Sequence, residues 1–511
     1  MLLEDNVTDL MQTCVLGIDV GTGGTRAVII DGRGRILASA TEEHEAFSSP
    51  KTGWAEQRPE DWWRATQLAV AKAIAQSGLH KEQIRCVGFS GQMHGAVMLD
   101  SSDEVVRPAL IWCDVRTEKQ CKDLSAQIGW ERLIQLTCNP PLANFTLTKL
   151  LWVRENEPDN WKRVRSVMLP KDYVRFRLTG EKAIDVADAS GTLMLDVAKR
   201  QWSTEVLKAV EIDSAVLPAL YESPQICGRV SAVGAEATGL VAGTPVVAGG
   251  GDQSAGAVGM GIVAPGAVSA TIGTSGVVFA STDQPVRDPQ GRLHTFCHAV
   301  PGRWHVMGVT QAAGLSLRWF RDRFTTSAAG NGADPYDLLM AEAATAPPGA
   351  DGLLWAPYLM GERTPHLDPN ARGALIGLTA SHTRAHVIRA ILEGVTFSLK
   401  DTFTILADMK IPVKSIRLGG GGARSSLWRQ IQADVYGQEV EIVEAEEGAA
   451  YGAAILAGVG AKMWPSVDEA CGSVVRVRDR VLPNATSVAV MQDSYARYRR
   501  MYDGMKFIFS S

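Results

Sequence analysis

Two short segments of the chain repeat one glycine- and threonine-rich turn. The first spans residues 19–25 (DVGTGGT) and the second spans residues 271–276 (TIGTSG). Each turn lies between two apolar runs typical of strands, so each is predicted to form the tip of a hairpin. Glycine lets the backbone approach an anion closely, and the threonine hydroxyl and successive N–H groups supply donors. Two such turns, a domain's length apart, predict a nucleotide held between two related lobes.

The length and the charge of the chain narrow the class of protein. A chain of 511 residues is longer than one hydrophobic core usually serves, so two domains of comparable size are expected. The 51 Lys and Arg residues against 56 Asp and Glu residues give a net charge of −5. This balance offers no overall attraction for nucleic acid or for an anionic membrane. The expected partners are therefore small molecules, with no nucleic acid and no membrane.

The cysteine pattern favours a reducing compartment. The eight cysteines are scattered, without a C-x-x-C pair or a spacing typical of metal ligands, and are expected to be buried thiols. No stretch reaches the apolar length of a membrane span, and the acidic N-terminus lacks the pattern of a secretory signal. A cytoplasmic location is therefore predicted.

Strand-like and helix-like patterns alternate along the chain, which predicts an α/β fold. The predicted strands include 84–90, 244–248 and 415–418, and the predicted helices include 59–75, 382–409 and 425–436. The glycines that follow residue 248 predict the entry to a second lobe, with a boundary near Met260. The expected organisation is an N-terminal extension (1–12), a first lobe (13–259), and a second lobe (260–511) that ends in a C-terminal helix.

Asp252 is the candidate general base. In residues 249–256 (GGGDQSAG) it follows an apolar strand and three glycines, which predicts a carboxylate at a strand-to-helix turn facing a cleft. A hydroxyl that attacks phosphorus must lose its proton to such a group. The alternative is that Asp252 only caps the following helix, and without the other motifs that alternative would be favoured.

Asp19 is the candidate metal-associated residue. A carboxylate at a phosphate turn repels a polyphosphate unless a divalent cation lies between them, and Mg²⁺ held through water is the natural mediator. The alternative is a turn aspartate that bonds its own backbone. The pairing with Thr22 and with the second turn at Thr274 favours the metal role.

A third glycine-rich segment, residues 419–425 (GGGGARS), links an apolar strand to an amphipathic helix. Such a connection lets the backbone pass close to a flat ring or a sugar, so the segment is assigned to the adenosine. A flexible linker is the alternative, but linkers of that kind are rarely set between a strand and a helix.

Residues 91–95 (GQMHG) follow a predicted strand, so their side chains emerge at its end. Met93 and His94 are candidates for lining a polyol pocket, and a structural histidine is an equally weighted alternative. Trp112, Asp114 and Arg116 are further cleft candidates, with a strand end and a surface ion pair as the equally weighted alternative. Three tryptophans are expected to be core residues rather than a sugar platform, namely Trp54, Trp62 and Trp63.

Together these motifs resemble the FGGY carbohydrate kinases, most closely their xylulokinase branch, over essentially the whole chain. The segments that carry the resemblance are 19–26 (DVGTGGTR), 91–95 (GQMHG), 249–252 (GGGD), 273–276 (GTSG), 361–366 (GERTPH) and 420–424 (GGGAR). Supporting stretches are 53–57 (GWAEQ), 169–173 (LPKDY) and 188–192 (DASGT). The resemblance implies two ribonuclease-H-like, actin-type ATPase lobes with the active site in the cleft between them. It also implies phosphorylation of D-xylulose by MgATP on the carbon-five hydroxyl.

The resemblance also implies roles for individual residues. Asp252 becomes the catalytic base, Asp19 the residue that holds Mg²⁺ through water, and Met93, His94 and Gln253 the sugar contacts beside Asp252. Trp112 is kept as a further candidate sugar contact from its position after a strand. The implied ATP contacts are Thr22, Gly23, Gly273, Thr274, Gly421, Gly422, Ala423 and Ser426. Segment 311–318 is expected near the nucleotide as well, and the frequent dimers among related kinases leave a homodimer open.

Gln253 departs from the xylulokinase pattern, which commonly has asparagine after the base, whereas glycerol kinases have glutamine. The extra methylene moves the amide by about one bond length and changes which hydroxyls it reaches. A kinase for another ketose or polyol, such as ribulose, is therefore the first alternative. An actin-like or chaperone-type ATPase and a nucleotide hydrolase on the same fold are the others.

Overall fold

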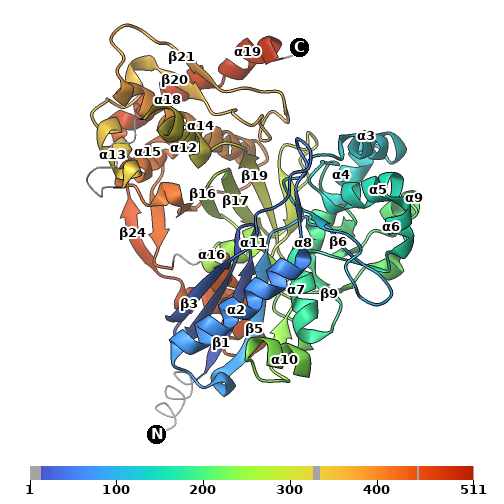
Figure 1. Cartoon of the computed structure of the whole chain (residues 1–511). Coiled ribbons are helices and arrows are strands. Elements are labelled where there is room, and N and C mark those ends of the chain that lie inside the picture. The colour runs from blue at the N-terminus through green and yellow to red at the C-terminus, as the bar shows by residue number, and fades with distance from the viewer. Residues whose placement is uncertain (1–12, 326–333, 446–447, 510–511) are drawn as a thin grey trace.

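The computed structural model describes residues 13–325, 334–445 and 448–509, so the expected extension 1–12 lies outside the described residues. Two seven-stranded sheets, each with its own helices, form the two halves of the molecule (Figure 1). The fold is a two-lobed α/β fold of the actin-type ATPase class, as the sequence predicts.

The first sheet is built around the hairpin that carries the first glycine-rich turn. Strand β1 pairs antiparallel with β2 across this turn and parallel with β5 on its other side. The spatial order is β13 (Ile226–Arg229), β14 (Pro245–Val247), β5 (Ile84–Gly91), β1 (Cys14–Val20), β2 (Gly24–Asp31) and β3 (Ile36–Glu43), with β15 (Gly250–Gly251) also on β5.

The second sheet repeats this arrangement around the second turn. Strand β16 pairs antiparallel with β17 and parallel with β22, as β1 pairs with β2 and β5. The spatial order is β18 (His294–Cys297), β19 (Trp304–Thr310), β17 (Gly276–Thr282), β16 (Ala267–Ile272), β22 (Ser415–Gly420), β23 (Val440–Val443) and β24 (Val477–Val481). The repeated topology explains why one turn motif occurs twice in the sequence.

Most of the elements expected from sequence patterns are present. The predicted strands correspond to β5, β14 and β22, and the predicted helices to α2 (Pro59–Ser77), α14 (Arg384–Asp408) and α15 (Ser426–Tyr436). The expected C-terminal helix is α19 (Met501–Phe509). The first-lobe core contains Trp62 and Trp63, as expected, whereas Trp54 is half-buried and packs edge-on against Trp152.

Further helices and short strands surround the two sheets (Figure 1). In the first half the helices are α3 (Glu118–Gln127), α4 (Trp130–Thr137), α5 (Thr146–Asn156), α6 (Pro158–Arg163), α7 (Pro170–Thr179), α8 (Val186–Ala189), α9 (Thr204–Ala209) and α10 (Ala232–Thr238). In the second half they are α12 (Gly314–Phe324), α13 (Pro335–Ala343), α17 (Val467–Val474) and α18 (Ala485–Tyr498). Among the helices that the structure describes, none combines the length and the apolar character needed to cross a membrane.

Two helices join the lobes at the centre of the molecule. Helix α11 (Asp252–Gly259) follows β15 of the first sheet, and α16 (Gly448–Gly460) packs on α11 and on β1 and β5 (Figure 1). The close approach depends on glycine, because a Cβ atom added at Gly17, Gly88 or Gly452 would lie less than 3.0 Å from a backbone oxygen of the facing element. The sequence motifs do not predict that α16, late in the chain, contacts the first sheet.

Candidate active site

Asp19 and Asp252 meet at the ends of three adjacent strands. Asp19 of β1 is paired with Ser90 of β5, and Ser90 is paired in turn with Gly250 of β15. Asp252 follows β15 as the first residue of α11, and Gly251 holds the N-cap position without a side-chain cap. The alternative that Asp252 serves as the helix cap is therefore wrong. Burial, and then the negative charge of Asp19, raise the pKa of Asp252 to about 7.

The carboxylate of Asp19 is suited to an ion whose other ligands are water molecules and substrate phosphates. Its Oδ1 atom is buried and finds no hydrogen-bond partner within the part of the chain that the structure describes. The same described residues contain no group of three or more histidine, cysteine or acidic side chains placed to hold a metal. Mg²⁺ is commonly bound by one or two carboxylates together with water and substrate phosphates, so the residues present fit this ion.

Two glutamine side chains bind the backbone carbonyls of the first glycine-rich turn. Gln57 Nε2 donates to the carbonyl of Thr22 at 2.8 Å, and Gln92 Nε2 donates to the carbonyl of Gly21 at 3.3 Å. A Cβ atom added at Gly23 would meet nothing within 4 Å, so this side of the turn is open. Trp112 also contacts the turn, because its indole Nε1 donates to the Thr22 hydroxyl at 2.9 Å. Trp112, a predicted sugar contact, therefore lies against the predicted phosphate turn.

The second turn lies at the start of α12. The N–H groups of Gly314 and Leu315 donate to the carbonyls of Gly273 and Thr274 at 2.8 and 3.1 Å. A cavity of about 350 Å³ opens here, within the size range of small-ligand sites. Its lining includes four predicted ATP contacts and three residues of segment 311–318, namely Gly273, Thr274, Gly421, Gly422, Gly314, Leu317 and Arg318.

The remaining predicted nucleotide contacts do not line this cavity. Ala423 is buried next to the lining residues, and Ser426 is exposed at the first position of α15. Thr22 and Gly23 belong to the turn of the other lobe. The cavity therefore lies between the second turn and the glycine-rich segment 419–425, the segment assigned to the adenosine.

Met93 and His94 lie beside the strand that leads to Asp252. A Cβ atom added at Gly251 would lie 2.8 Å from Met93 Cγ and 3.1 Å from an Asp188 carboxylate oxygen. His94 has a left-handed backbone with φ of 65°, and its Nδ1 lies 2.8 Å from the carbonyl of Gly191. Burial lowers the pKa of His94 to about 3, so its ring is neutral. The pair is thus fixed next to the candidate base, and Gln253 follows that base in α11.

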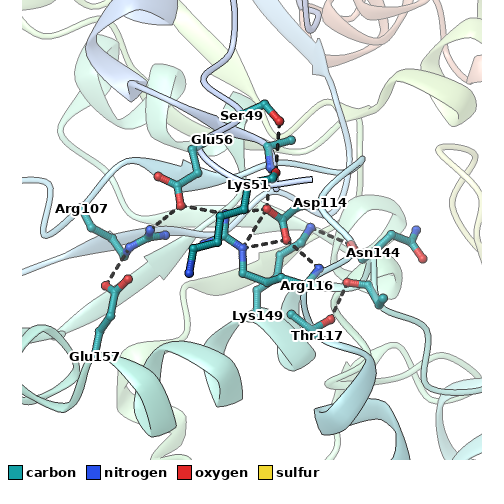
Figure 2. A network of polar contacts seen from close by, with 12 residues as sticks. Ser49, Lys51, Glu56, Arg107, Asp114, Arg116, Thr117, Asn144, Lys149 and Glu157 are labelled. Carbon is teal, nitrogen blue, oxygen red and sulfur yellow. Dashed lines mark hydrogen bonds and ion pairs between the residues drawn. The ribbon is translucent and has the colours of Figure 1, made fainter. Parts of the chain in front are cut away.

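Lys149, Asp114 and Arg116 belong to a buried polar network (Figure 2). Lys149 Nζ donates to the carbonyls of His94 and Asn144 at 2.8 and 2.7 Å, and burial lowers the pKa of Lys149 to about 7. Asp114 and Arg116 form a close ion pair at 2.6 Å in the same network, with side chains 0% and 1% exposed. The alternative of a surface ion pair is therefore wrong, since the segments around the pair cover it.

Sequence reasoning gave no role to a second buried cluster near the base. Lys171 Nζ lies 2.6 Å from Asp185 and 3.3 Å from Asp188, and all three side chains are fully buried. Neither carboxylate oxygen of Asp188 has a hydrogen-bond partner among the described residues, and burial raises its pKa well above the usual value. The resemblance of 169–173 and 188–192 to a known family was the only signal for this cluster in the sequence.

Comparison with known proteins assigns the chain to a family. A model of the FGGY family of carbohydrate kinases, N-terminal domain, matches residues 14–259, and the C-terminal domain model matches residues 268–461. The chain belongs to the FGGY family of carbohydrate kinases. It is therefore a sugar kinase, an enzyme that transfers a phosphoryl group to a carbohydrate.

Relatives of this FGGY kinase span its whole length. A xylulose kinase of Bacillus subtilis is 37% identical over 492 residues, which cover 96% of this chain and 97% of that protein. A xylulose kinase of Escherichia coli is 40% identical over 488 residues, which cover 95% and 98%. The solved structure of a xylulose kinase from Brucella ovis has a TM-score of 0.89 at 34% identity, and the match covers 97% of this chain and 100% of that one.

Proposed function

We propose that this FGGY kinase phosphorylates D-xylulose on its carbon-five hydroxyl with MgATP. The observation that carries the proposal is the packing of Met93 against Gly251, which sets the predicted sugar pair beside the carboxylate of Asp252. The full-length similarity to proteins described as xylulose kinases supports the choice of sugar.

Asp252 acts as the general base in this proposal. The carbon-five oxygen attacks the γ-phosphorus, the bond from that phosphorus to the bridging oxygen breaks, and ADP leaves with the bonding electrons. Asp252 takes the hydroxyl proton. A pKa of about 7 suits this role, because a base near the working pH is both free and basic enough to accept the proton.

The two turns bind the phosphates from opposite lobes. The first turn supplies Thr22 and Gly23, and the second supplies the N–H groups of Gly273 and Thr274. Asp19 holds Mg²⁺ through water, and the ion when bound offsets charge on the phosphates. Gly421, Gly422, Ala423 and Ser426 hold the adenosine side of ATP, with the cavity of about 350 Å³ as its site.

Residues 13–259 and 260–511 are proposed as the two lobes that close over the substrates. Closure would exclude water, so that the γ-phosphate meets the sugar rather than a water molecule. Helices α11 and α16 lie at the junction, so relative motion of the lobes would first change the packing between these two helices. The cytoplasmic location and the homodimer remain predictions.

A second sugar is favoured by one specific feature. Gln253 replaces the asparagine expected in a xylulose pocket, and a gluconokinase of Bacillus subtilis is also 33% identical over 453 residues, covering 87% of each protein. Phosphorylation of another ketose, a polyol or a sugar acid is therefore the second candidate function.

ADP formation from MgATP tests both candidates directly. The purified enzyme is assayed in parallel with D-xylulose, D-ribulose, L-ribulose, glycerol, D-gluconate and no sugar. Strong stimulation by D-xylulose alone supports the proposal. Preference for another compound keeps the mechanism but replaces the substrate, and turnover that ignores sugar favours an ATPase or a hydrolase.

A further inference from the structure

The segment 361–366 (GERTPH) of the second lobe is anchored next to the second turn. The carboxylate of Glu362 accepts hydrogen bonds from the Thr310 hydroxyl at 2.6 Å and from the backbone N–H of Gln311 at 2.9 Å. The backbone N–H of Arg363 donates to the same carboxylate at 2.8 Å. Gln311 opens the segment that leads to Gly314, whose N–H binds the carbonyl of Gly273. The backbone at Arg363 is therefore fixed relative to the predicted phosphate site.

The side chain of Arg363 reaches toward the sugar residues of the other lobe. Its Nη1 atom lies 3.4 Å from His294 Nε2. The ring of Phe145 bridges His294 to His94, with centroid distances of 5.6 and 4.9 Å. After burial itself, the positive charge of Arg363 lowers the pKa of His294, and it also contributes to the low pKa of His94. The guanidinium thus lies beside His294 and within electrostatic range of His94, while the backbone of its segment is anchored beside Gln311.

The charge of Arg363 is only partly offset among the described residues, since burial lowers its pKa and the nearby carboxylate of Glu362 raises it against that effect. Two more deeply buried arginines are paired, Arg116 with Asp114 at 2.6 Å and Arg389 with Glu393 at 2.8 Å, whereas Arg363 is half-buried. No ion pair of Arg363 occurs in the described part of the chain, and its neighbour Glu362 binds Thr310 and Gln311 instead. Burial lowers the pKa of Arg363 to about 10, which leaves it charged at neutral pH. A half-buried guanidinium that forms no ion pair with the described residues is free to bind an anion from outside the chain.

We propose that Arg363 is a catalytic residue that donates N–H hydrogen bonds to the phosphoryl group during its transfer to the sugar. This inference rests on the proposed kinase reaction, in which D-xylulose is neutral and the phosphates are the anions. Arg363 stays protonated and forms no covalent bond. Its charge offsets the negative charge on the equatorial oxygens of the transferring group, as positioned arginines do in other phosphoryl transfers.

The test compares Arg363→Ala and Arg363→Lys with Arg372→Met as a matched control. Arg372 belongs to the same connecting segment but is exposed and donates only to the backbone carbonyls of Pro369 and Ala371. We expect Arg363→Ala to lower kcat about 10²- to 10³-fold, the usual loss when one donor to a transition-state anion is removed. The KM for MgATP and for the sugar should change less than about threefold, because the lost hydrogen bonds form in the transition state and not in the ground state. Arg363→Lys should keep an intermediate kcat, and Arg372→Met should match the parent.

Two further measurements separate this role from a structural one. Guanidinium chloride at millimolar concentration should raise the kcat of Arg363→Ala and leave Arg372→Met unchanged. ADP with aluminium fluoride, bound together with the sugar, mimics the transferring phosphoryl group. The affinity for this mimic should fall about 10²-fold or more in Arg363→Ala, while the affinity for ADP alone is kept. Thermal unfolding of each variant shows whether the fold is intact.

Three outcomes would overturn the inference. One is a parent-like kcat and a parent-like affinity for the mimic in Arg363→Ala. Another is a change confined to the sugar KM with D-gluconate as the preferred substrate, which would assign Arg363 to a substrate carboxylate. The third is equal loss of ADP binding and of the mimic. If the parent enzyme phosphorylates no sugar, the proposed function is wrong, and the inference about Arg363 is wrong as well.

Discussion

The backbone oxygen of Ala450 occupies the space beside Gly17 in which a Cβ atom would have to lie. A Cβ atom added at Gly17 would come within 3.0 Å of this oxygen, a distance that real Cβ atoms do not adopt. Gly17 is in β1, the strand that carries Asp19, and Ala450 is in α16 at the junction of the lobes. The strand that positions the candidate metal residue is therefore packed directly against the junction helix.

Replacing Gly17 should destabilise the protein for this reason. In Gly17→Ala the added methyl group must push β1 and α16 apart, and we expect a loss of about 1–3 kcal/mol or more in the free energy of unfolding. Thermal unfolding measures the loss. Gly472→Ala is the control, because its Cβ atom would meet nothing within 4 Å on the exposed face of α17. Equal thermal midpoints in the two variants would contradict the packing argument.

Asp252→Asn should abolish turnover without harming the fold. We expect kcat to fall about 10²- to 10⁴-fold, the range for removal of a positioned general base. The buried carboxylate lies beside Asp19, so removing its charge relieves repulsion and should leave the thermal midpoint equal to or above that of the parent. Binding of MgATP, followed by calorimetry, should be retained. Sugar phosphorylation near the parent rate would rule out Asp252 as the base.

Gln253→Asn tests how the residue after the base selects the sugar. The shorter side chain withdraws the amide by one methylene, which should change the ratio of kcat/KM between D-xylulose and D-ribulose about tenfold, since an altered polar contact is worth 1–3 kcal/mol or so. The measurement is a pair of steady-state assays on each sugar with parent and variant. An unchanged ratio would show that Gln253 does not contact the sugar where the two compounds differ.

The candidate nucleotide cavity can be filled without disturbing the protein around it. A Cβ atom added at Gly421 would meet nothing closer than 3.8 Å, although Gly421 lines the cavity. Gly421→Val should therefore raise the KM for MgATP about tenfold or more, because a clash with the ligand costs 1–3 kcal/mol or so. The sugar KM and the thermal midpoint should stay close to the parent values. A rise confined to the sugar KM would place the nucleotide elsewhere.

The parts of the fold that could be predicted from sequence are those set by local patterns. A glycine-rich turn between two apolar runs specifies a hairpin within about fifteen residues, so both hairpins were found, and with them the two-lobed class. The position of Asp252 also follows locally, because a strand, glycines and a helix are consecutive in the chain. The glycine-rich segment 419–425 meets the second turn in one cavity because β22 is the parallel neighbour of β16.

The missed features all depend on residues far apart in the chain. Arg363 contacts His294, 69 residues earlier, and the Nδ1 atom of His94 contacts Gly191, 97 residues later. The burial of the Asp114–Arg116 pair depends on Trp54, whose ring lies 3.6 Å from the Arg116 guanidinium carbon. No spacing within a single segment reveals such contacts, so the sequence could not tell a surface ion pair from a buried one.

A buried acid outside the cleft should make stability depend on pH. Asp401 in α14 accepts a hydrogen bond from the Tyr495 hydroxyl at 2.7 Å, and burial raises its pKa to about 7, against the opposing charge of Arg499. The ordinary pKa of an aspartate is near 4, so between about pH 4 and pH 7 the folded protein holds a proton that the unfolded chain has released. The free energy of unfolding contributed by Asp401 is therefore present below pH 4 and is lost as the pH rises through 7.

Asp401→Asn should remove this dependence, because asparagine keeps an acceptor for Tyr495 but carries no charge. We expect the variant to gain stability over the parent as the pH rises from 4 to 7, up to about 4 kcal/mol, and no further gain above pH 8. Denaturant unfolding across this range gives the difference. Burial also raises the pKa of Glu362 to about 7, and the charge of Asp401 is the last of its causes, so the contribution of Glu362 is similar in both proteins but cancels only in part. Asp408→Asn, an exposed change in the same helix, should give a pH-independent difference, and the same flat result for Asp401→Asn would refute the argument.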